Sequence, residues 1–350
     1  MKNQYNKFIA IFFIISVAMI LMCVLTTIII DPFYHYHAPI EPMRLVQEKQ
    51  AYQNLGISKH LSYDAIITGS SMTENFRVSQ LNELFDCNAV KLSFQGGRIP
   101  NYDLLFNEAF KNKDIEIKKI FYGCDISAYI DDPNSEIPNQ IPEYLYDENI
   151  FTDIKYVLNK TVMFNYVMPY LKDSLQDNLP DVDDAYTWYQ LCTFDKSVAM
   201  SQYTRPDAEE KKSISLYDEN VKVNCEKIGK YIKENPDVEF NIFFPPYSIL
   251  YYDYFNRLGT LEAVIHSQEM ITEYFLQFPN VKLSSFMSEE EIIFNLNNYK
   301  DYTHYSEKIN EYMAKNIKTE EKLLNKDNYK KYFERVKQLL QNYDYEQLFK

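Results

Sequence analysis

Three short segments carry the residues with which this chain could do chemistry. A Gly-Ser-Ser turn ends at Ser71, Gly96 and Gly97 form a glycine pair, and Asp301 precedes His304 by three residues near the end of the chain. A serine hydroxyl is a weak nucleophile that needs a base, and an imidazole oriented by a carboxylate is a suitable one. Each segment is weak evidence alone, because such turns also cap helices and an Asp-x-x-His arises by chance. Together they predict a serine nucleophile with a histidine base.

The elements between these segments alternate in a way that would bring them together. Short apolar runs that read as strands lie at 64–68, 89–94, 118–123, 238–244 and 281–286. Helix-length stretches lie at 73–85, 101–113, 215–235 and 261–278. This alternation predicts an α/β fold, with a parallel sheet covered by helices on both faces. Because sites in such sheets form at the carboxyl ends of the strands, the Gly-Ser-Ser turn and the glycine pair are expected at one edge.

Other stretches break this rhythm. Residues 126–214 contain no clear strand and are rich in Pro, Asp and Tyr, which predicts a helical insert over the carboxyl edge of the sheet. A connector at 31–61 is expected to hold one short helix around Pro42–Leu55. The tail at 328–350 has apolar residues at helical spacing and predicts an amphipathic helix. The expected domain is therefore 62–350, with the insert inside it.

The first 30 residues form a domain of their own, a signal-anchor helix. The segment Phe8–Ile30 is unbroken by charge, and its 23 residues would span about 35 Å as a helix, enough for the hydrocarbon layer. It is longer than the core of a secretory signal, and no small-residue cleavage site follows it. Lys2 and Lys7 precede it with no acid between them, which favours a cytoplasmic N-terminus. The sequence thus predicts a single-pass plasma-membrane protein with residues 31–350 outside the cytoplasm.

Composition excludes several classes of function. Lysine and arginine total 36 against 50 aspartates and glutamates, and a net charge of −14 argues against binding to nucleic acid. A hydrophobic content of 46% argues against disorder. The cysteines match no zinc pattern and either pair outside the cell or remain buried thiols. His35 and His37 lack accompanying ligands, and no nucleotide-binding motif is present, so no metal or other cofactor is expected.

The order and placement of the three segments resemble the SGNH/GDSL hydrolase family. That family has a Gly-x-Ser turn after its first strand, a glycine loop after its second and a late Asp-x-x-His. The likeness covers residues 62–320 apart from the insert. Gly-Ser-Ser in place of Gly-Asp-Ser, the anchor, and Phe-Phe-Pro-Pro at 243–246 are similar to the membrane-anchored branch that includes the D-alanine-transfer protein of teichoic-acid modification. The resemblance implies a three-layer, flavodoxin-like sheet.

The same resemblance implies roles for the residues. Ser71 would be the nucleophile, His304 the base and Asp301 the acid that orients it. The backbone N–H groups of Ser71 and of Gly96 or Gly97 would form the oxyanion hole, which stabilises the negative charge of a tetrahedral intermediate.

The third strand departs from the family pattern. Where the family has an Asn that donates to the oxyanion, this chain has Asp125. An ionised carboxylate there would repel the oxyanion, so either Asp125 is turned away, or it is protonated, or the hole has backbone donors alone. Tyr247 and Tyr251 follow the fourth strand and either line a groove for substrate or are packing residues. We expect Asp125, Tyr247 and Tyr251 to adjoin the substrate.

These expectations define a function and one rival. The chain would be an extracytoplasmic serine esterase or O-acyltransferase that acts on a cell-surface glycan or a teichoic-acid-like polymer through an acyl-serine intermediate. Its partners would be that polymer or an acyl donor, the membrane, and, as a further candidate, a membrane-bound O-acyltransferase. The rival is a non-catalytic SGNH-like scaffold that binds a polymer or recruits such an acyltransferase. A short distance between Ser71 and His304 would favour the enzyme.

Overall fold

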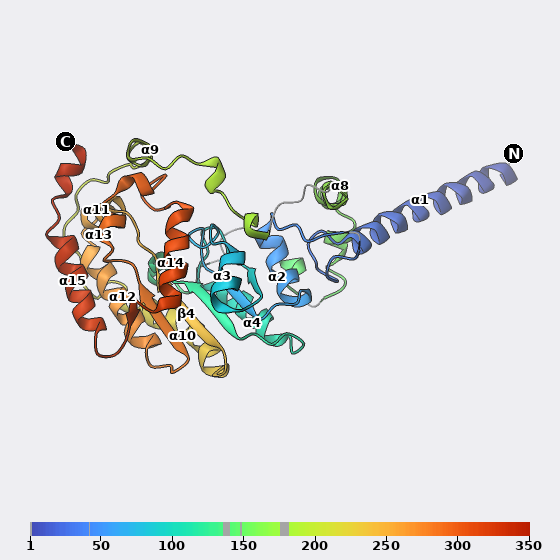
Figure 1. Ribbon diagram of the computed structural model, residues 1–350. Helices are drawn as coiled ribbons and strands as arrows, with labels where there is room; N and C mark the ends of the chain where they lie inside the picture. Colours follow the sequence, from blue (N-terminus) through green and yellow to red (C-terminus); the bar gives the residue numbers. More distant parts are fainter. Residues whose placement is uncertain (1, 42, 136–140, 148, 176–181) are drawn as a thin grey trace. The chain divides into compact units, whose positions relative to one another are not determined.

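Figure 1 shows the computed structural model of the chain, which describes residues 2–41, 43–135, 141–147, 149–175 and 182–350. The chain divides into two compact units, each made from two stretches: Met1–Leu61 with Gln140–Asp181, and Ser62–Asn139 with Val182–Lys350. We call the first the anchor unit and the second the sheet unit. The segment 126–214, expected as one insert, contributes to both units. Its residues 136–140, 148 and 176–181 lie outside the described residues.

The described part of the sheet unit contains one mostly parallel sheet. Its strands are β1 Ala65–Thr68, β2 Ala89–Lys91, β3 Lys119–Gly123, β4 Glu239–Phe244, β5 Val281–Ser285 and β6 Leu323–Leu324. They lie in the order β2-β1-β3-β4-β5-β6, and only the β5–β6 pair is antiparallel. The predicted α/β class is confirmed, and each of the five predicted runs contains a strand. The edge strand β6 was missed because two residues are too few to show a periodic pattern.

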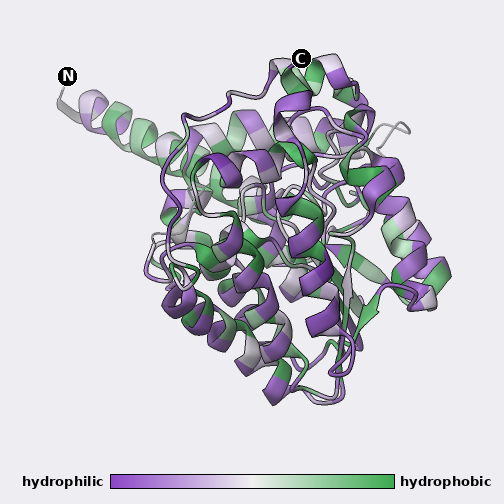
Figure 2. Cartoon of the chain, turned by 90° about the vertical axis from the view of Figure 1, so that its left-hand side faces the viewer, coloured by the Kyte–Doolittle hydropathy of each residue, from purple (hydrophilic) through white to green (hydrophobic). Residues whose placement is uncertain are grey.

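Helices cover both faces of this sheet. The pairs in contact are α3 Val78–Phe85 with α14 Glu307–Thr319, α4 Ile99–Lys111 with α10 Asp218–Glu234, and α12 Leu261–Phe275 with both α10 and α15 Tyr329–Gln341. Right-handed crossovers put α3 on one face and α4 and α10 on the other, because the chain reverses direction across the sheet after β2. Figure 2 shows hydrophilic and hydrophobic residues on different sides of the helices, as expected for helices that bury one face.

Shorter helices of the sheet unit flank the strand ends. They are α5 Ile126–Ile130, α9 Lys196–Ser201, α11 Ile249–Arg257 and α13 Glu290–Ile293. The C-terminal helix α15 ends at Gln341, and a 3-10 helix, Tyr345–Phe349, follows it, so the tail at 328–350 is two elements rather than one. The five cysteines are free thiols.

The anchor unit begins with α1, Lys2–Ile30, which is long and apolar enough to cross a membrane. Asp31 ends this helix: its buried carboxylate accepts the N–H groups of His35, Tyr36 and His37 at 3.0, 2.7 and 3.1 Å. The hydroxyl of Tyr156 donates to the same carboxylate at 2.7 Å. The chain therefore turns back sharply where the apolar run stops.

The connector helix lies later in the sequence than expected. It is α2, Gln50–His60, rather than Pro42–Leu55. The N–H groups of Glu48 and Lys49 both donate to the side-chain oxygen of Gln53 at 2.8 Å, which holds the preceding chain in a non-helical turn. The remaining helices of the described part of this unit are the 3-10 helix η1 Glu143–Leu145, α6 Ile154–Val157, α7 Lys160–Val162, the π-helical η2 Met163–Val167 and α8 Met168–Ser174.

Candidate active site

Ser71 lies in a tight turn directly after β1. Gly69 begins the turn with a φ of +150°, and a Cβ there would lie 2.6 Å from Thr73 Cγ2, so glycine is required. Thr73 donates to the carbonyl oxygen of Ser70 from its N–H at 3.0 Å and from its hydroxyl at 2.8 Å. The sequence predicted a helix immediately after Ser71, but α3 begins only at Val78. That expectation was wrong, because the residues beside Ser71 form a closed turn and not a helix N-terminus.

His304 lies in a second closed loop, which leads into α14. An isolated antiparallel bridge joins Tyr299 to Tyr305 at the base of this loop. Inside it, Asp301 Oδ1 accepts the N–H groups of Thr303 and His304, both at 2.8 Å. The carboxylate thus holds the backbone of the loop as well as the imidazole, so its direction is fixed by contacts with Thr303 and His304.

The two loops are tied to each other at Met72, the residue after Ser71. The buried hydroxyl of Tyr305 donates to the carbonyl oxygen of Met72 at 3.1 Å, and the amide of Asn310 donates to the same oxygen at 2.9 Å. Both donors come from the region around the N-terminus of α14. Residues more than 230 positions apart in the sequence are therefore held in register by buried hydrogen bonds.

This arrangement places three side chains in a chain of contacts. Ser71 Oγ lies 2.7 Å from His304 Nε2, and His304 Nδ1 lies 2.8 Å from Asp301 Oδ2. Burial alone would raise the pKa of Asp301, but hydrogen bonds from His304 and Thr303 and the imidazole charge together lower it. An ionised Asp301 holds the imidazole proton on Nδ1, which leaves Nε2 to accept the proton of the serine hydroxyl.

Trp188, the only tryptophan of the chain, contacts both loops and was not singled out from the sequence. Its indole N–H donates to the carbonyl oxygen of Ser71 at 3.2 Å, and its ring packs edge-to-face on His304 with centroids 5.2 Å apart. The ammonium of Lys300 lies 4.5 Å from the centroid of the indole. A lone Trp in an acidic, Tyr-rich insert was the available signal, but nothing in the sequence linked it to either loop.

Lys91 of β2 anchors the segment that carries Trp188. It is a fully buried lysine whose ammonium donates to the carbonyl oxygens of Glu74 at 2.7 Å, Ala185 at 2.8 Å and Asp183 at 3.3 Å. Burial lowers the pKa of Lys91 to about 7. The contacts join the turn after Ser71 to the residues just before Trp188, so Lys91 acts on the site through its neighbours.

Of the glycine pair Gly96-Gly97, only one backbone N–H is available to a ligand. The N–H of Gly97 donates to the carbonyl oxygen of Phe94 at 2.8 Å, which occupies it. Gly96 has a φ of +62° and its N–H meets no protein acceptor within the described residues, and the same is true of the N–H of Ser71. Of the alternatives that the sequence left open, Gly96 is therefore the better partner for the Ser71 amide.

Asp125, Tyr247 and Tyr251 form the opposite wall of the site. The hydroxyl of Tyr247 donates to Asp125 Oδ1, and the rings of Tyr247 and Tyr251 stack with centroids 4.0 Å apart. All three side chains are buried. Burial raises the pKa of Asp125 to about 6, although Ser70 and the His304 charge partly oppose this effect. The carboxyl is thus not turned away to solvent, and burial favours its protonated form more than in an exposed aspartate.

These groups line one cavity of about 540 Å³. Ser71, His304, Gly96, Asp125 and the two tyrosines all contribute to its lining. The side chains of His304 and Asp301 are 25% and 21% exposed, so the base is accessible from solvent. The cavity is large enough for an acyl group with part of an alcohol or sugar.

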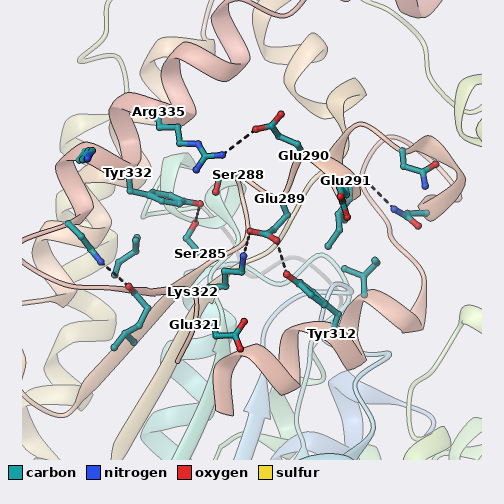
Figure 3. A pocket seen from close by; sticks show the side chains of 18 residues that line it. Ser285, Ser288, Glu289, Glu290, Glu291, Tyr312, Glu321, Lys322, Tyr332 and Arg335 are labelled. Carbon is teal, nitrogen blue, oxygen red and sulfur yellow. Dashed lines mark hydrogen bonds and ion pairs between the residues drawn. The ribbon is translucent and has the colours of Figure 1, made fainter. Parts of the chain in front are cut away.

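A second cavity of about 850 Å³ lies in the sheet unit among α13, α14, β6 and α15 (Figure 3). Four of its charged groups form ion pairs: Lys322 pairs with Glu289 at 2.8 Å and Arg335 with Glu290 at 3.3 Å. The hydroxyl of Tyr312 also donates to Glu289, at 2.7 Å. The side chains that line it include serines but no histidine, so they offer no nucleophile with a base.

The two histidines that follow α1, His35 and His37, are engaged in other contacts. His35 Nε2 lies 3.2 Å from Asp153 Oδ1, and the ring nitrogens of His37 lie 2.8 and 2.6 Å from the carbonyl oxygens of Ile28 and Ala38. Within the described residues, no group of three or more His, Cys, Asp or Glu side chains is arranged to hold a metal.

Comparison with known proteins adds little to this geometry. No family model matches the chain, and no curated protein matches it. Among solved structures, one described as "a putative platelet activating factor from Streptococcus pneumonia" aligns with 78% of this chain and 92% of its own, at 11% sequence identity and a TM-score of 0.40. A likeness at that level identifies neither a family nor an activity.

Proposed function

We propose that this protein is a membrane-anchored serine esterase or O-acyltransferase. The observation that carries the proposal is the 2.7 Å separation of Ser71 Oγ and His304 Nε2, with His304 Nδ1 on Asp301. A nucleophile, a base and a group that orients the base are the parts that acyl transfer requires. The scaffold alternative does not require such a contact, and the distance therefore favours the enzyme.

In the first half-reaction, His304 Nε2 takes the hydroxyl proton as Ser71 Oγ attacks the carbonyl carbon of an ester. The carbonyl oxygen becomes an oxyanion, which the N–H groups of Ser71 and Gly96 are the candidates to stabilise. When the tetrahedral intermediate collapses, the bond to the alcohol breaks and His304 returns the proton to the leaving oxygen. An acyl-serine remains.

In the second half-reaction, a water or a polymer hydroxyl enters the cavity. His304 takes its proton as its oxygen attacks the acyl carbon, and the bond to Ser71 Oγ breaks with the proton returned to Oγ. Water gives hydrolysis, and a hydroxyl gives transfer. The stacked Tyr247 and Tyr251 contribute aromatic and hydroxyl groups to the cavity lining, and such amphipathic side chains suit a polar acceptor such as a glycan.

Fold and location support the same proposal. The strand order β2-β1-β3-β4-β5 is the flavodoxin-like order, and Ser71 follows β1 at the point where the order reverses, where ligands bind in such sheets. This agrees with the resemblance to SGNH/GDSL hydrolases. The apolar α1 and the lysines before it support an extracytoplasmic domain that acts at the cell surface, on a glycan or a teichoic-acid-like polymer.

The test is labelling and turnover of the purified full chain in detergent. A fluorophosphonate should label the wild type at Ser71 and a Ser71→Ala variant not at all, with ester turnover lost in parallel. The matched control is Ser70→Ala, which removes the adjacent hydroxyl and should still be labelled. Equal labelling or turnover of wild type and Ser71→Ala would remove Ser71 from the mechanism.

A further inference from the structure

Seven large apolar side chains of the anchor unit are exposed within one short stretch, residues 150–175. We call them the apolar collar: Ile150, Phe151, Ile154, Leu158, Phe164, Met168 and Leu175. Phe151 is 85% exposed and Ile150 is 74% exposed. Single exposed apolar residues are ordinary, but a gathering of this kind marks a surface that meets something other than water.

The collar is firmly attached to the end of the membrane helix. Elements α6 and η2, which carry part of it, are the described neighbours of α1. Tyr156 of α6 donates its hydroxyl to Asp31 and stacks on Phe33 with ring centroids 5.5 Å apart. Tyr166 of η2 packs edge-to-face on Phe33 at 4.9 Å. The segment is therefore held against the last residues of α1 by buried contacts.

The burial pattern of α1 fixes the depth of these contacts. Side chains from Val17 to Met22 are exposed, whereas Val24 is half-buried and Thr27 and Ile30 are buried. Packing thus covers only the last two turns of the helix, about 10 Å of its length. The apolar run Phe8–Ile30 is about 35 Å long, slightly more than the hydrocarbon layer. If α1 spans the bilayer, whatever packs on its last two turns lies at the membrane–water boundary.

The sequence of the collar has the pattern of an interfacial segment. Ile154 and Leu158 are four residues apart on one helical face, and so are Phe164 and Met168 along η2 and α8. Buried residues between them, such as Tyr156, face the unit's own core. The same stretch carries three exposed lysines, Lys155, Lys160 and Lys172, although the chain as a whole has a net charge of −14. Lysines beside an apolar face suit lipid headgroups.

We infer that the apolar collar inserts into the outer leaflet beside α1, where its apolar side chains meet acyl chains and its lysines meet headgroup phosphates. The anchor unit is then seated in the membrane surface and not only tethered to it. We assign lipid, and not a protein, as what covers the collar, because elements that carry the collar pack on the end of α1 that would lie at the membrane surface. This inference concerns a site separate from the cavity of Ser71, and it depends on the spanning role and the orientation of α1, not on the proposed catalysis.

The experiment is fluorescence quenching by brominated lipids in nanodiscs that hold one full-length chain each. Phe151→Trp and Phe164→Trp replace exposed collar side chains, and Leu191→Trp is the matched control, because Leu191 is 90% exposed in the sheet unit. The fluorescence of the wild type, which comes from Trp188, is subtracted as the baseline. We expect lipids brominated near the headgroup end of the chains to quench most of the added fluorescence of the two collar variants. They should leave that of the control unquenched.

Three outcomes would overturn the inference. Collar tryptophans that aqueous acrylamide quenches and brominated lipid does not would place the collar in water. Protection from both quenchers only in densely loaded vesicles would assign the collar to a second copy. Protection only after a membrane acyltransferase is added would assign it to a protein partner. Fluorophosphonate labelling of Ser71 in each variant separates any of these results from failure of the proposed catalysis.

Discussion

The Ser71 cavity has two sides that differ in their contacts: a base side with His304 and Asp301, and an oxyanion side with Gly96, Gly97 and Asp125. On the base side, Asp301 holds both the imidazole of His304 and the backbone of its loop, and the contacts from Ser71 Oγ to Nε2 and from Nδ1 to Oδ2 are 2.7 and 2.8 Å long. On the oxyanion side, the N–H of Gly97 is occupied by the carbonyl oxygen of Phe94, and the cavity lining includes the buried carboxyl of Asp125. For the proposed mechanism this difference means that the contacts of the base side are complete, whereas stabilisation of the oxyanion by the Ser71 and Gly96 amides also depends on whether Asp125 carries a proton.

The largest effect is expected from breaking the base side. An Asp301→Asn variant keeps the size of the side chain but no longer holds the imidazole proton on Nδ1. We expect kcat/KM for an ester to fall by about 10³–10⁴. The labelling rate by a fluorophosphonate should fall in parallel, because both reactions need the serine proton removed. Thermal stability should be compared to establish that the loop still folds.

Asp131→Asn is the matched control for this prediction. Asp131 also lines the cavity, but it pairs with Arg98 and touches neither Ser71 nor His304 in the described contacts. Its amide variant should retain activity within a few-fold. If Asp301→Asn were as active as Asp131→Asn, the orienting role of Asp301 would be refuted.

The oxyanion side should respond in the opposite direction. Asp125→Asn supplies an amide donor that is neutral at all pH values, so its activity relative to the wild type should rise with pH. Because the pKa of Asp125 is raised to about 6, the two proteins should be similar at pH 5, where the carboxyl is largely protonated. At pH 8 the carboxylate opposes the oxyanion, and we expect the variant to be faster by up to about 10².

Stability gives an independent readout of the same carboxyl. A folded-state pKa above the ordinary value means that Asp125 contributes stability below pH 4 that is lost as pH rises through 6. A shift from 3.8 to about 6 corresponds to a contribution on the order of 3 kcal/mol. The Asp125→Asn variant should therefore gain thermal stability relative to the wild type between pH 5 and pH 8. If neither the difference in stability nor the ratio of rates changed between pH 5 and pH 8, Asp125 would keep one protonation state over that whole range.

The segments that carry Ser71 and His304 could be predicted from the sequence, for a physical reason. Ser71 and His304 stand in segments marked by local signals, a glycine turn after an apolar run and a polar loop before a helix. Parallel-sheet geometry then brings such segments to one edge whatever the rest of the chain does. The α/β class and the catalytic candidates therefore followed from local patterns.

The supporting contacts could not be found in this way. Lys91 lies within an apolar run, and only the fold shows that it reaches the carbonyl oxygens beside Trp188. The occupied amide of Gly97 depends on the exact turn, which the residue types do not specify. The hydroxyl of Thr73 likewise bonds the carbonyl oxygen of Ser70 and lies 2.7 Å from the hydroxyl of Ser93 in a region where a helix was expected, and α3 starts only at Val78. Each of these is a tertiary contact, and periodicity carries no information on it.

The smallest effect is expected from Trp188, which contacts both Ser71 and His304. Trp188→Phe keeps an aromatic ring against His304 but removes the N–H that donates to the carbonyl oxygen of Ser71. One hydrogen bond is worth about 1 kcal/mol, so we expect kcat to fall by roughly fivefold to tenfold. KM should be nearly unchanged, because Trp188 is outside the cavity lining and acts as a positioning residue. Leu191→Ala, in the same segment but exposed, should leave both constants as they are. A rise in KM without a change in kcat would instead make Trp188 a substrate contact. The substrate-binding surface would then include the segment that carries Trp188, beyond the loops at the strand ends.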